Sequence, residues 1–500
     1  MGIIVKNSAK VSIINLIGVA IAAVSVLFIQ TQYLTEKEIG AIKILNSLAL
    51  AAFPFILMGF GSASLRFYHF FESNKKANHQ FLTYIIFIPF LLLLICSGIS
   101  LLLQDFIEAK FFANSPYLKN FIYILPGLIF YYVYFVLFES LLTIKAKIVI
   151  PNFIKSIINR LYLIVLIFIY AADLVNFDNL LILYVVLHIG NVALISYYYF
   201  RSIKFNYSPA LGFQKNVKYR EFSVYSLYVI FGSLAGVIVS QIDTLMTGYL
   251  LKDIGMVGVY SIAFFIGVVI ETPKRPIIQM TIPIISKELT AGNNHEVEKL
   301  YKQSSINLFI VGALMFLVIW ANIDAIFQIL PNGEKYIEGK YVVFFIGLSK
   351  LFDLAVGINF EIIQFSKFYR WNILLTPFLA IMAIITNYFF IREYGIVGTA
   401  IATAISILVY NSVRSILVYY KLKMNSITYR HLIVSVLLVV LILLLEIINI
   451  SNPFVSIAVK ATVVSILFML PILLLKISPE VNRAIKTVLK NKLNIETNWL

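Results

Sequence analysis

Residues 11–30 read VSIINLIGVAIAAVSVLFIQ, and this stretch decides the fold of the chain. It holds no charged residue, and its length is what an α-helix needs to cross the hydrocarbon core of a bilayer. Lys6 and Lys10 precede it and no small-residue cleavage site follows it. We therefore expect a retained first transmembrane helix rather than a signal peptide.

Similar apolar runs recur along the whole chain. Hydrophobic residues make up 61% of the sequence and charged residues 13%, whereas soluble domains carry about 25% charged residues. A chain this apolar cannot cover its own surface in water, so its solvent must be lipid. The predicted fold class is all-α, a polytopic membrane protein with about fourteen transmembrane helices. The predicted spans are residues 11–30, 41–60, 81–103, 121–142, 154–172, 180–200, 222–250, 255–272, 303–322, 341–362, 372–391, 396–419, 431–448 and 454–475.

The connectors between these spans are short, so no soluble domain is expected. The longest, at residues 273–302, contains three prolines and then a polar stretch, and residues 293–298 are predicted to start a short surface helix. The single cysteine, Cys96, lies inside an apolar run, which excludes an internal disulfide framework and a multi-cysteine metal site.

The basic residues predict the orientation. Connectors on the same side as the N-terminus collect most of the 40 lysines and arginines, and the opposite connectors hold only a few. The positive-inside rule therefore places both termini in the cytoplasm. The net charge of +16 is explained by this topology, so nucleic-acid binding is not needed to explain it.

The chain also repeats itself. TQYL at 31–34 followed by IGAI at 39–42 is matched by TGYL at 247–250 followed by VGVY at 257–260. Six spans separate the copies, so both halves have the same membrane orientation, with a pseudo-two-fold axis along the membrane normal. A chance match in a chain rich in Tyr and Leu is the alternative. The predicted division is a lobe of six helices at residues 1–210, a second at 211–425, both around a central cavity, and a final helix pair with a cytoplasmic tail at 426–500.

Three stretches resemble a known family. YLTEKEIG at 33–40, QID at 241–243 and YGIVGTAIAT at 394–403 are similar to motifs of the bacterial lipid-linked oligosaccharide flippases. These are the Wzx-type O-antigen and polysaccharide exporters of the multidrug/oligosaccharidyl-lipid/polysaccharide superfamily. The resemblance covers roughly residues 5–420, and it departs from the family at Thr399, where a small residue is usual.

The resemblance implies an activity and a location. Such a protein moves polyprenyl-pyrophosphate-linked oligosaccharide, the repeat unit of O-antigen, lipopolysaccharide or capsule, from the cytoplasmic to the periplasmic leaflet by alternating access. It lies in the bacterial inner membrane, among membrane lipids, and can work beside a polysaccharide polymerase machinery.

The tenth predicted span holds the strongest candidate site. Gly347, Lys350, Asp353, Gly357 and Glu361 fall on one face at three- and four-residue steps. Ionisable side chains inside a membrane usually face a cavity or a partner. Lys350 is predicted to contact an anionic head group, and Asp353 to take part in ion coupling. The alternative is that these two residues neutralise each other as a structural pair.

Other charged residues extend this prediction. Arg414 in the twelfth span, and Arg66, Lys274 and Arg275 at cytoplasmic helix ends, are candidate ligands for pyrophosphate, which arginine binds with two parallel hydrogen bonds. Alternatively, Arg414 snorkels to the interface and the other three anchor the topology. Asp243 in the seventh span is a second candidate for ion coupling, or else a hydrogen-bonding group for a neighbouring helix.

Three functional classes compete. The sequence contains no Walker A motif, nucleotide-binding loop or His/Cys cluster, so we expect no enzyme and no cofactor, while coupling to Na⁺ or H⁺ stays open. The flippase is the first interpretation. A multidrug or cation exporter of the same fold should have an acidic lumen and twelve helices. A membrane-embedded polysaccharide polymerase or glycosyltransferase should have a large outer loop, and the connector at 323–340 is too short. A flippase for the peptidoglycan precursor is a close variant of the first, but its arginines in the first two spans are missing here.

Overall fold

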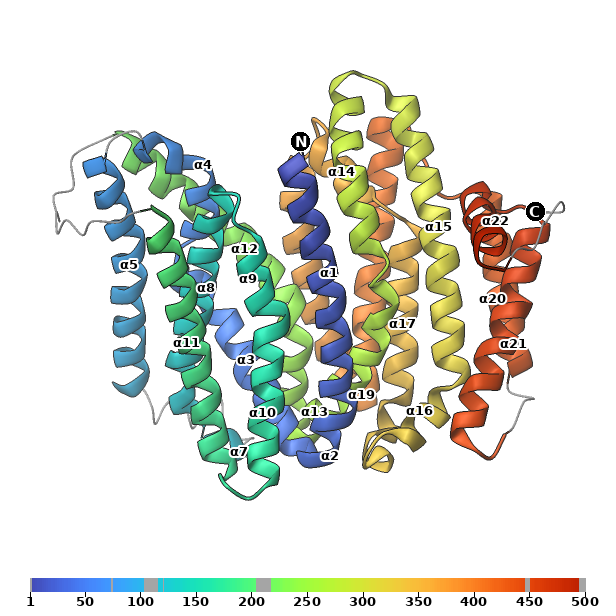
Figure 1. The fold of residues 1–500 in the computed structure, drawn as a ribbon, viewed down its shortest axis with the longest axis horizontal. Helices are drawn as coiled ribbons and strands as arrows, with labels where there is room; N and C mark the ends of the chain where they lie inside the picture. Colours follow the sequence, from blue (N-terminus) through green and yellow to red (C-terminus); the bar gives the residue numbers. More distant parts are fainter. Residues whose placement is uncertain are drawn as a thin grey trace. The chain divides into compact units, whose positions relative to one another are not determined.

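The computed structural model describes residues 2–72, 75–102, 116–119, 121–203, 217–445 and 450–493 (Figure 1). In these ranges every regular element is a helix, which confirms the all-α fold class. The chain begins with α1 (Gly2–Val24), η1 (Ser25–Gln30) and α2 (Thr31–Tyr33). These three consecutive helical segments together form the first span.

The number of spans agrees with the prediction. Over the described residues, eleven helices are long and apolar enough to cross a membrane singly. A bent pair, α17 (Lys340–Ala355) and α18 (Asn359–Phe365), adds one, and the shorter apolar helix α20 (Tyr429–Leu445) adds another. α19 (Arg370–Leu422) joins two helices across a kink at Gly395, where φ is 57° and ψ is −136°, so it supplies two spans instead of one.

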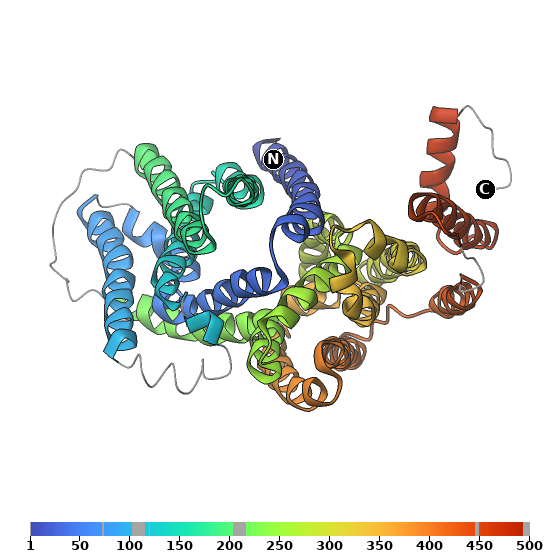
Figure 2. The same ribbon diagram turned by 90° about the horizontal axis from the view of Figure 1, so that it is seen from below.

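By its internal packing the chain separates into two units, residues 1–261 and 262–500, which are described separately. In the first unit, α8 packs against α3, α4, α5 and α11, and α12 lies along α3 in both views (Figure 2). The helices of this unit not yet bounded are α3 (Glu36–Leu57), α4 (Phe60–Glu72), α5 (Lys75–Leu102), α7 (Pro116–Lys119), η3 (Ile122–Ile124), α8 (Leu125–Ile144), α9 (Val149–Phe153), η4 (Ile154–Ile158), α10 (Asn159–Ala171), α11 (Phe177–Ile203), α12 (Val217–Leu251) and most of α13 (Ile254–Val268).

The two copies of the sequence repeat meet inside this first unit. A Cβ atom built on Gly40 would lie 2.0 Å from the carbonyl oxygen of Ile254, and one built on Gly258 would lie 2.1 Å from that of Glu36. Each glycine thus allows the N-terminal part of its own helix to contact the backbone at the N-terminus of the helix in the other copy. Alanine would not fit at either position. Reciprocal contacts of this kind are the mark of a two-fold relation, here between α3 and α13.

In the second unit, α15 packs against α14, α17, α20 and α21, and α17 packs along α19. Its core is aliphatic and aromatic, with Leu308, Phe316 and Phe468 almost fully buried. The helices of this unit not yet bounded are η5 (Val269–Glu271), α14 (Lys274–Thr290), α15 (Asn294–Ala321), α16 (Ile323–Ile329), η6 (Gly333–Gly339), α21 (Pro453–Leu474) and α22 (Pro479–Leu493).

The predicted connector at 273–302 is helical for most of its length, and the short surface helix predicted to start at residues 293–298 is wrong. Residues 274–290 form α14, and residue 294 already begins α15, which is continuous with the ninth span, so no separate surface helix forms there. The prolines misled the prediction: Pro273 precedes the first turn and Pro276 lies within it, where a missing N–H breaks no helical hydrogen bond. α14 therefore continues α13 after the short η5, much as α4 continues α3 after a break at Met58 and Gly59, which both have positive φ. The division at residues 210 and 425 stays a prediction.

Candidate functional site

A break in the tenth span positions the candidate site of the second unit. α17 ends at Ala355 and α18 begins at Asn359, and the two are bent by 48°. Gly357 turns the chain with φ of +66°, a conformation that other residues adopt only under strain. Ser305 of α15 donates a hydrogen bond to the Ala355 carbonyl and lies 2.9 Å from His431 Nε2, so the opened helix end is satisfied by polar partners.

Asp353 lies one turn before this break and holds two partners. Lys274 Nζ, at the first residue of α14, lies 2.5 Å from Asp353 Oδ2. Asn411 of α19 donates to Asp353 Oδ1 at 2.9 Å. The side chains of Lys274 and Asp353 are only 13% and 17% exposed. The carboxylate thus ties α14, α17 and α19 together, and Lys274 lies beside it at the break between η5 and α14, just beyond the span that ends at Glu271.

Lys350 pairs with a different carboxylate. Its Nζ lies 2.6 Å from Glu271 Oε2 in η5, and the Lys350 side chain is 17% exposed. Lys350 and Asp353 therefore do not form the self-neutralising pair that was the alternative. Each is instead held by a residue next to the η5–α14 break, three positions apart in the sequence.

Arg414 and Glu361 are the most deeply buried charges of this set, with 6% and 7% of their surfaces exposed. The Arg414 guanidinium is stacked between the rings of Tyr410 and Phe360, with its Cζ 4.0 and 4.6 Å from the ring centroids. Arg414 Nε and Glu361 Oε2 have no hydrogen-bond partner among the described residues. Both residues thus retain hydrogen-bonding capacity in a buried setting.

The remaining predicted residues lie elsewhere. Arg275 is exposed on α14, and Arg66 is exposed on α4 of the first unit, with its Cζ 4.5 Å from the ring centroid of Tyr225. Asp243 of α12 accepts a hydrogen bond from the Tyr260 hydroxyl at 3.1 Å. The structure thus brings four of the predicted residues together in the second unit, namely Lys274, Lys350, Asp353 and Arg414.

Sequence reasoning missed two members of this group, Glu271 and Asn411. A signal for both was present, since Glu271 lies three residues before Lys274 and Asn411 three residues before Arg414, which is one turn of a helix. The full group, called here the charged cluster, consists of Glu271, Lys274, Lys350, Asp353, Glu361, Asn411 and Arg414. It contains three cations and three carboxylates.

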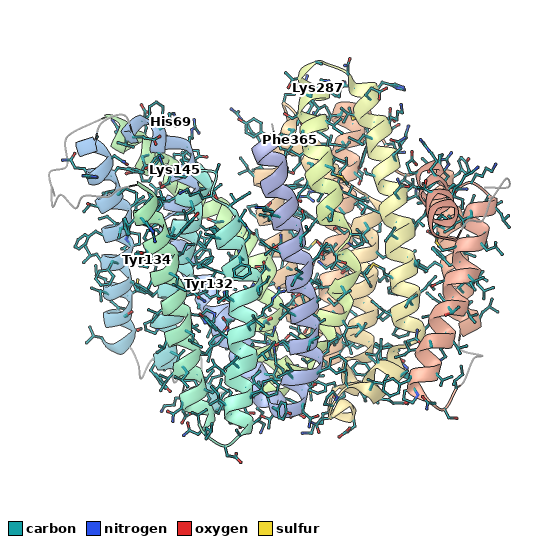
Figure 3. All side chains as sticks on the ribbon, in the orientation of Figure 1. His69, Tyr132, Tyr134, Lys145, Lys287 and Phe365 are labelled. Carbon is teal, nitrogen blue, oxygen red and sulfur yellow. The ribbon has the colours of Figure 1, made fainter. Side chains whose placement is uncertain are left out.

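The first unit holds a neutral polar network of its own. Asn46 Oδ1 accepts hydrogen bonds from the hydroxyls of Tyr132 at 2.8 Å and Tyr184 at 3.4 Å. Ser47 donates to Gln241 Oε1 at 2.8 Å. Figure 3 shows Tyr132 well away from His69 and Lys145, which lie near one end of this unit.

A family model described as polysaccharide biosynthesis protein matches residues 4–289, more than half of the sequence. The chain belongs to this family. No curated protein sequence gives a significant match.

Similar solved structures identify the fold of this chain. The inward closed form of the lipid II flippase MurJ is similar with a TM-score of 0.70 at 15% identity, over 92% of this chain and 98% of that one. An inward-facing multidrug resistance MATE family transporter of the MOP superfamily is similar with a TM-score of 0.64 at 14% identity, over 82% and 98%. An outward-facing MATE family transporter gives 0.52 at 16%, over 84% and 96%. The resemblance found in the sequence is confirmed in family and in fold, and the protein is a multi-pass membrane protein of the MOP-superfamily fold.

Proposed function

We propose that this polysaccharide biosynthesis protein is a flippase that moves polyprenyl-pyrophosphate-linked oligosaccharide from the cytoplasmic to the periplasmic leaflet of a bacterial inner membrane by alternating access. Its family description and its MOP-superfamily fold support the transport of a polysaccharide precursor. The match to MurJ covers 92% of this chain, and the match to the inward-facing MATE transporter covers 82%. The difference is about 50 residues, which is enough for two spanning helices.

One observation carries the proposal: the charged cluster holds three cations inside a membrane-spanning unit. Lysine and arginine are costly there and usually mark a substrate or ion pathway. Lys350 is the most available of the three cations, because its partner Glu271 is 34% exposed and sits beside a helix break. A pyrophosphate could replace that carboxylate with little loss of electrostatic energy, and Arg414 offers an unused N–H donor.

The remaining features of the proposal concern coupling and surroundings. Asp353 and Asp243 are the proposed carboxylates for coupling to Na⁺ or H⁺, since each is a carboxylate within a spanning helix. The proposed topology has both termini in the cytoplasm, and the proposed cargo is an O-antigen or capsule repeat unit, delivered onward to a polysaccharide polymerase.

A proteoliposome assay tests the proposal. A fluorescent polyprenyl-pyrophosphate oligosaccharide is added to one leaflet, and its transfer is scored by protection from a membrane-impermeant quencher. Lys350→Ala should abolish transfer, whereas Lys340→Ala should retain it, because Lys340 begins the same helix but lies in an exposed pair with Asp324. Transfer by Lys350→Ala at the wild-type rate, with both variants folded, would remove the charged cluster from the mechanism.

A cation exporter of the same fold is the second candidate, and Glu361 favours it. This buried carboxylate has one oxygen without a partner among the described residues, which is the group that a cationic substrate or coupling ion requires. Uptake of an organic cation under a Na⁺ or H⁺ gradient, lost in Glu361→Gln and accompanied by no lipid transfer, would establish the exporter instead.

A further inference from the structure

A pocket outside the charged cluster lies between α4 and α12 in the first unit. Its volume is about 460 Å³, within the range of small-molecule sites. Arg66 and Phe67 line it from α4, and Arg220, Glu221, Tyr225 and Tyr228 line it from α12. Two arginines and two tyrosines surround one opening. The arginines suit a phosphorylated ligand, and the tyrosine rings suit a flat or apolar part of the same ligand.

The wall of this pocket is built by tight packing on its inner side. Gly59, with φ of +69°, lets the start of α4 approach α12 so closely that a Cβ there would lie 2.6 Å from the Ser226 carbonyl oxygen. Phe222 is fully buried, with its ring centroid 5.3 Å from that of Phe60 and 5.2 Å from that of Phe81. The two helices are therefore fixed against each other, and the pocket-lining residues project from a rigid base.

The two arginines are exposed and available. Arg66 Cζ stacks 4.5 Å from the ring centroid of Tyr225, which orients the guanidinium. Among the described residues neither Arg66 nor Arg220 forms an ion pair. Among the described residues that line the pocket, Glu221 is the one carboxylate beside two arginines, so this part of the lining has a net positive charge.

The pocket lies at the cytoplasmic end of its helices as the positive-inside rule assigns them. Arg66 is in the last two turns of α4, and Arg220 is in the first turn of α12. Lys75 and Lys76 begin α5, the helix that follows α4 in the chain, and add positive charge on the same side of the predicted topology. Exposed apolar surface from Tyr228, which is 74% exposed, lies at the same opening and suits a ligand that remains in the membrane.

We propose that this pocket binds the pyrophosphate of a polyprenyl-linked glycolipid at the cytoplasmic surface, as a docking site separate from the charged cluster. This inference rests on the proposed function. The two guanidinium groups donate hydrogen bonds to the pyrophosphate oxygens, while Glu221 and Tyr225 face the first sugar, whose hydroxyls donate hydrogen bonds to the Glu221 carboxylate. Bulk phospholipid is the less suitable occupant, because a single phosphate does not need two arginines and gains nothing from Glu221.

Equilibrium binding of a fluorescent polyprenyl pyrophosphate to the detergent-solubilised full chain tests the inference. The measurement is made in Lys350→Ala, so that binding at the charged cluster does not mask the pocket. Adding Arg66→Gln and Arg220→Gln should raise the Kd about tenfold or more, since each removes charge-assisted hydrogen bonds. Adding Arg201→Gln, an exposed arginine of α11 outside the pocket, should change it less than twofold. Arg66→Lys should give an intermediate Kd, because lysine keeps the charge but loses the fork and the ring stacking.

The outcomes separate the pocket from the proposed function. An unchanged Kd in the double arginine variant, or an equal rise with Arg201→Gln, overturns the pocket even if the wild type transfers lipid. Displacement of the probe by phosphatidylglycerol as readily as by unlabelled polyprenyl pyrophosphate makes it a bulk-lipid site and also overturns it. If the wild type neither binds the probe nor transfers glycolipid, the proposed function fails and the pocket assignment fails with it. Equal melting temperatures confirm folding, and Arg220→Gln alone replaces the double variant if that variant is unstable.

Discussion

The pair between Lys274 and Asp353 allows a quantitative test of the charged cluster. At 2.5 Å, two unit charges in an effective dielectric of about 20 attract each other by about 7 kcal/mol, and desolvation of both side chains offsets most of that gain. Removal of one partner leaves the other charge buried and unpaired. Lys274→Met or Asp353→Asn alone should therefore reduce the free energy of unfolding by about 3 kcal/mol.

The double variant should recover much of this loss. Lys274→Met with Asp353→Asn leaves no unpaired charge at this position, and the asparagine can still accept the hydrogen bond from Asn411. We expect the double variant to lose about 1 kcal/mol, which corresponds to a coupling energy of about 5 kcal/mol. The measurement is the free energy of unfolding of all four proteins in mixed detergent micelles.

An exposed pair in the same unit provides the control. Lys340 Nζ lies 2.6 Å from Asp324 Oδ1, almost the same separation, but the two side chains are 30% and 64% exposed. Water and salt screen such a pair, so its coupling energy should stay within about 0.5 kcal/mol. Equal coupling energies in the two cycles, or strictly additive losses at Lys274 and Asp353, would refute the reasoning that burial gives the charged cluster its energy.

Three further predictions concern glycines and Arg414. Gly357→Ala should lower the free energy of unfolding by about 2–3 kcal/mol, because φ is +66° and the added Cβ would lie 3.0 Å from a backbone atom. The control is Gly292→Ala, where φ is +76° but the added Cβ meets open space, and the free energy of unfolding should fall by only about 1 kcal/mol. Gly258→Ala should lower the melting temperature markedly because its Cβ would meet a carbonyl oxygen, whereas Gly98→Ala, with nothing within 4 Å, should leave it unchanged or raise it slightly. Arg414→Lys should slow lipid transfer about tenfold in the proteoliposome assay, since lysine loses the planar stacking between two rings; an undiminished rate would exclude Arg414 from the site.

The spanning helices could be predicted from sequence because lipid imposes one simple requirement, a long apolar run with its backbone hydrogen bonds closed internally. This requirement does not report on α14, which is not a span, and whose lysines and prolines hid its helical structure. The helix breaks were equally hidden. Gly357 and Gly59 are visible as glycines in the sequence, but the left-handed turn that each makes depends on a neighbouring helix approaching at that level.

The candidate site could be predicted only in part. Helical spacing placed Lys350 and Asp353 on one face correctly, since that relation is local. Their ion-pair partners come from the η5–α14 break, about 80 residues earlier, and no periodicity within one helix reports a contact of that kind. The repeat was more informative, because Gly40 and Gly258 occupy equivalent positions in the two copies and the structure places each against the other copy.

The two units differ in the chemistry of their buried polar groups. In the first unit the phenols of Tyr132 and Tyr184 converge on Asn46, and such groups both donate and accept, as sugar hydroxyls require. In the second unit the polar groups are ammonium, guanidinium and carboxylate, which suit phosphate and ions. A duplicated scaffold needs only its packing glycines to remain alike, so its interior positions are free to diverge. If the proposed substrate is correct, a related flippase for another sugar should differ mainly at positions such as Asn46, whereas every pyrophosphate-linked cargo should require the cations of the charged cluster.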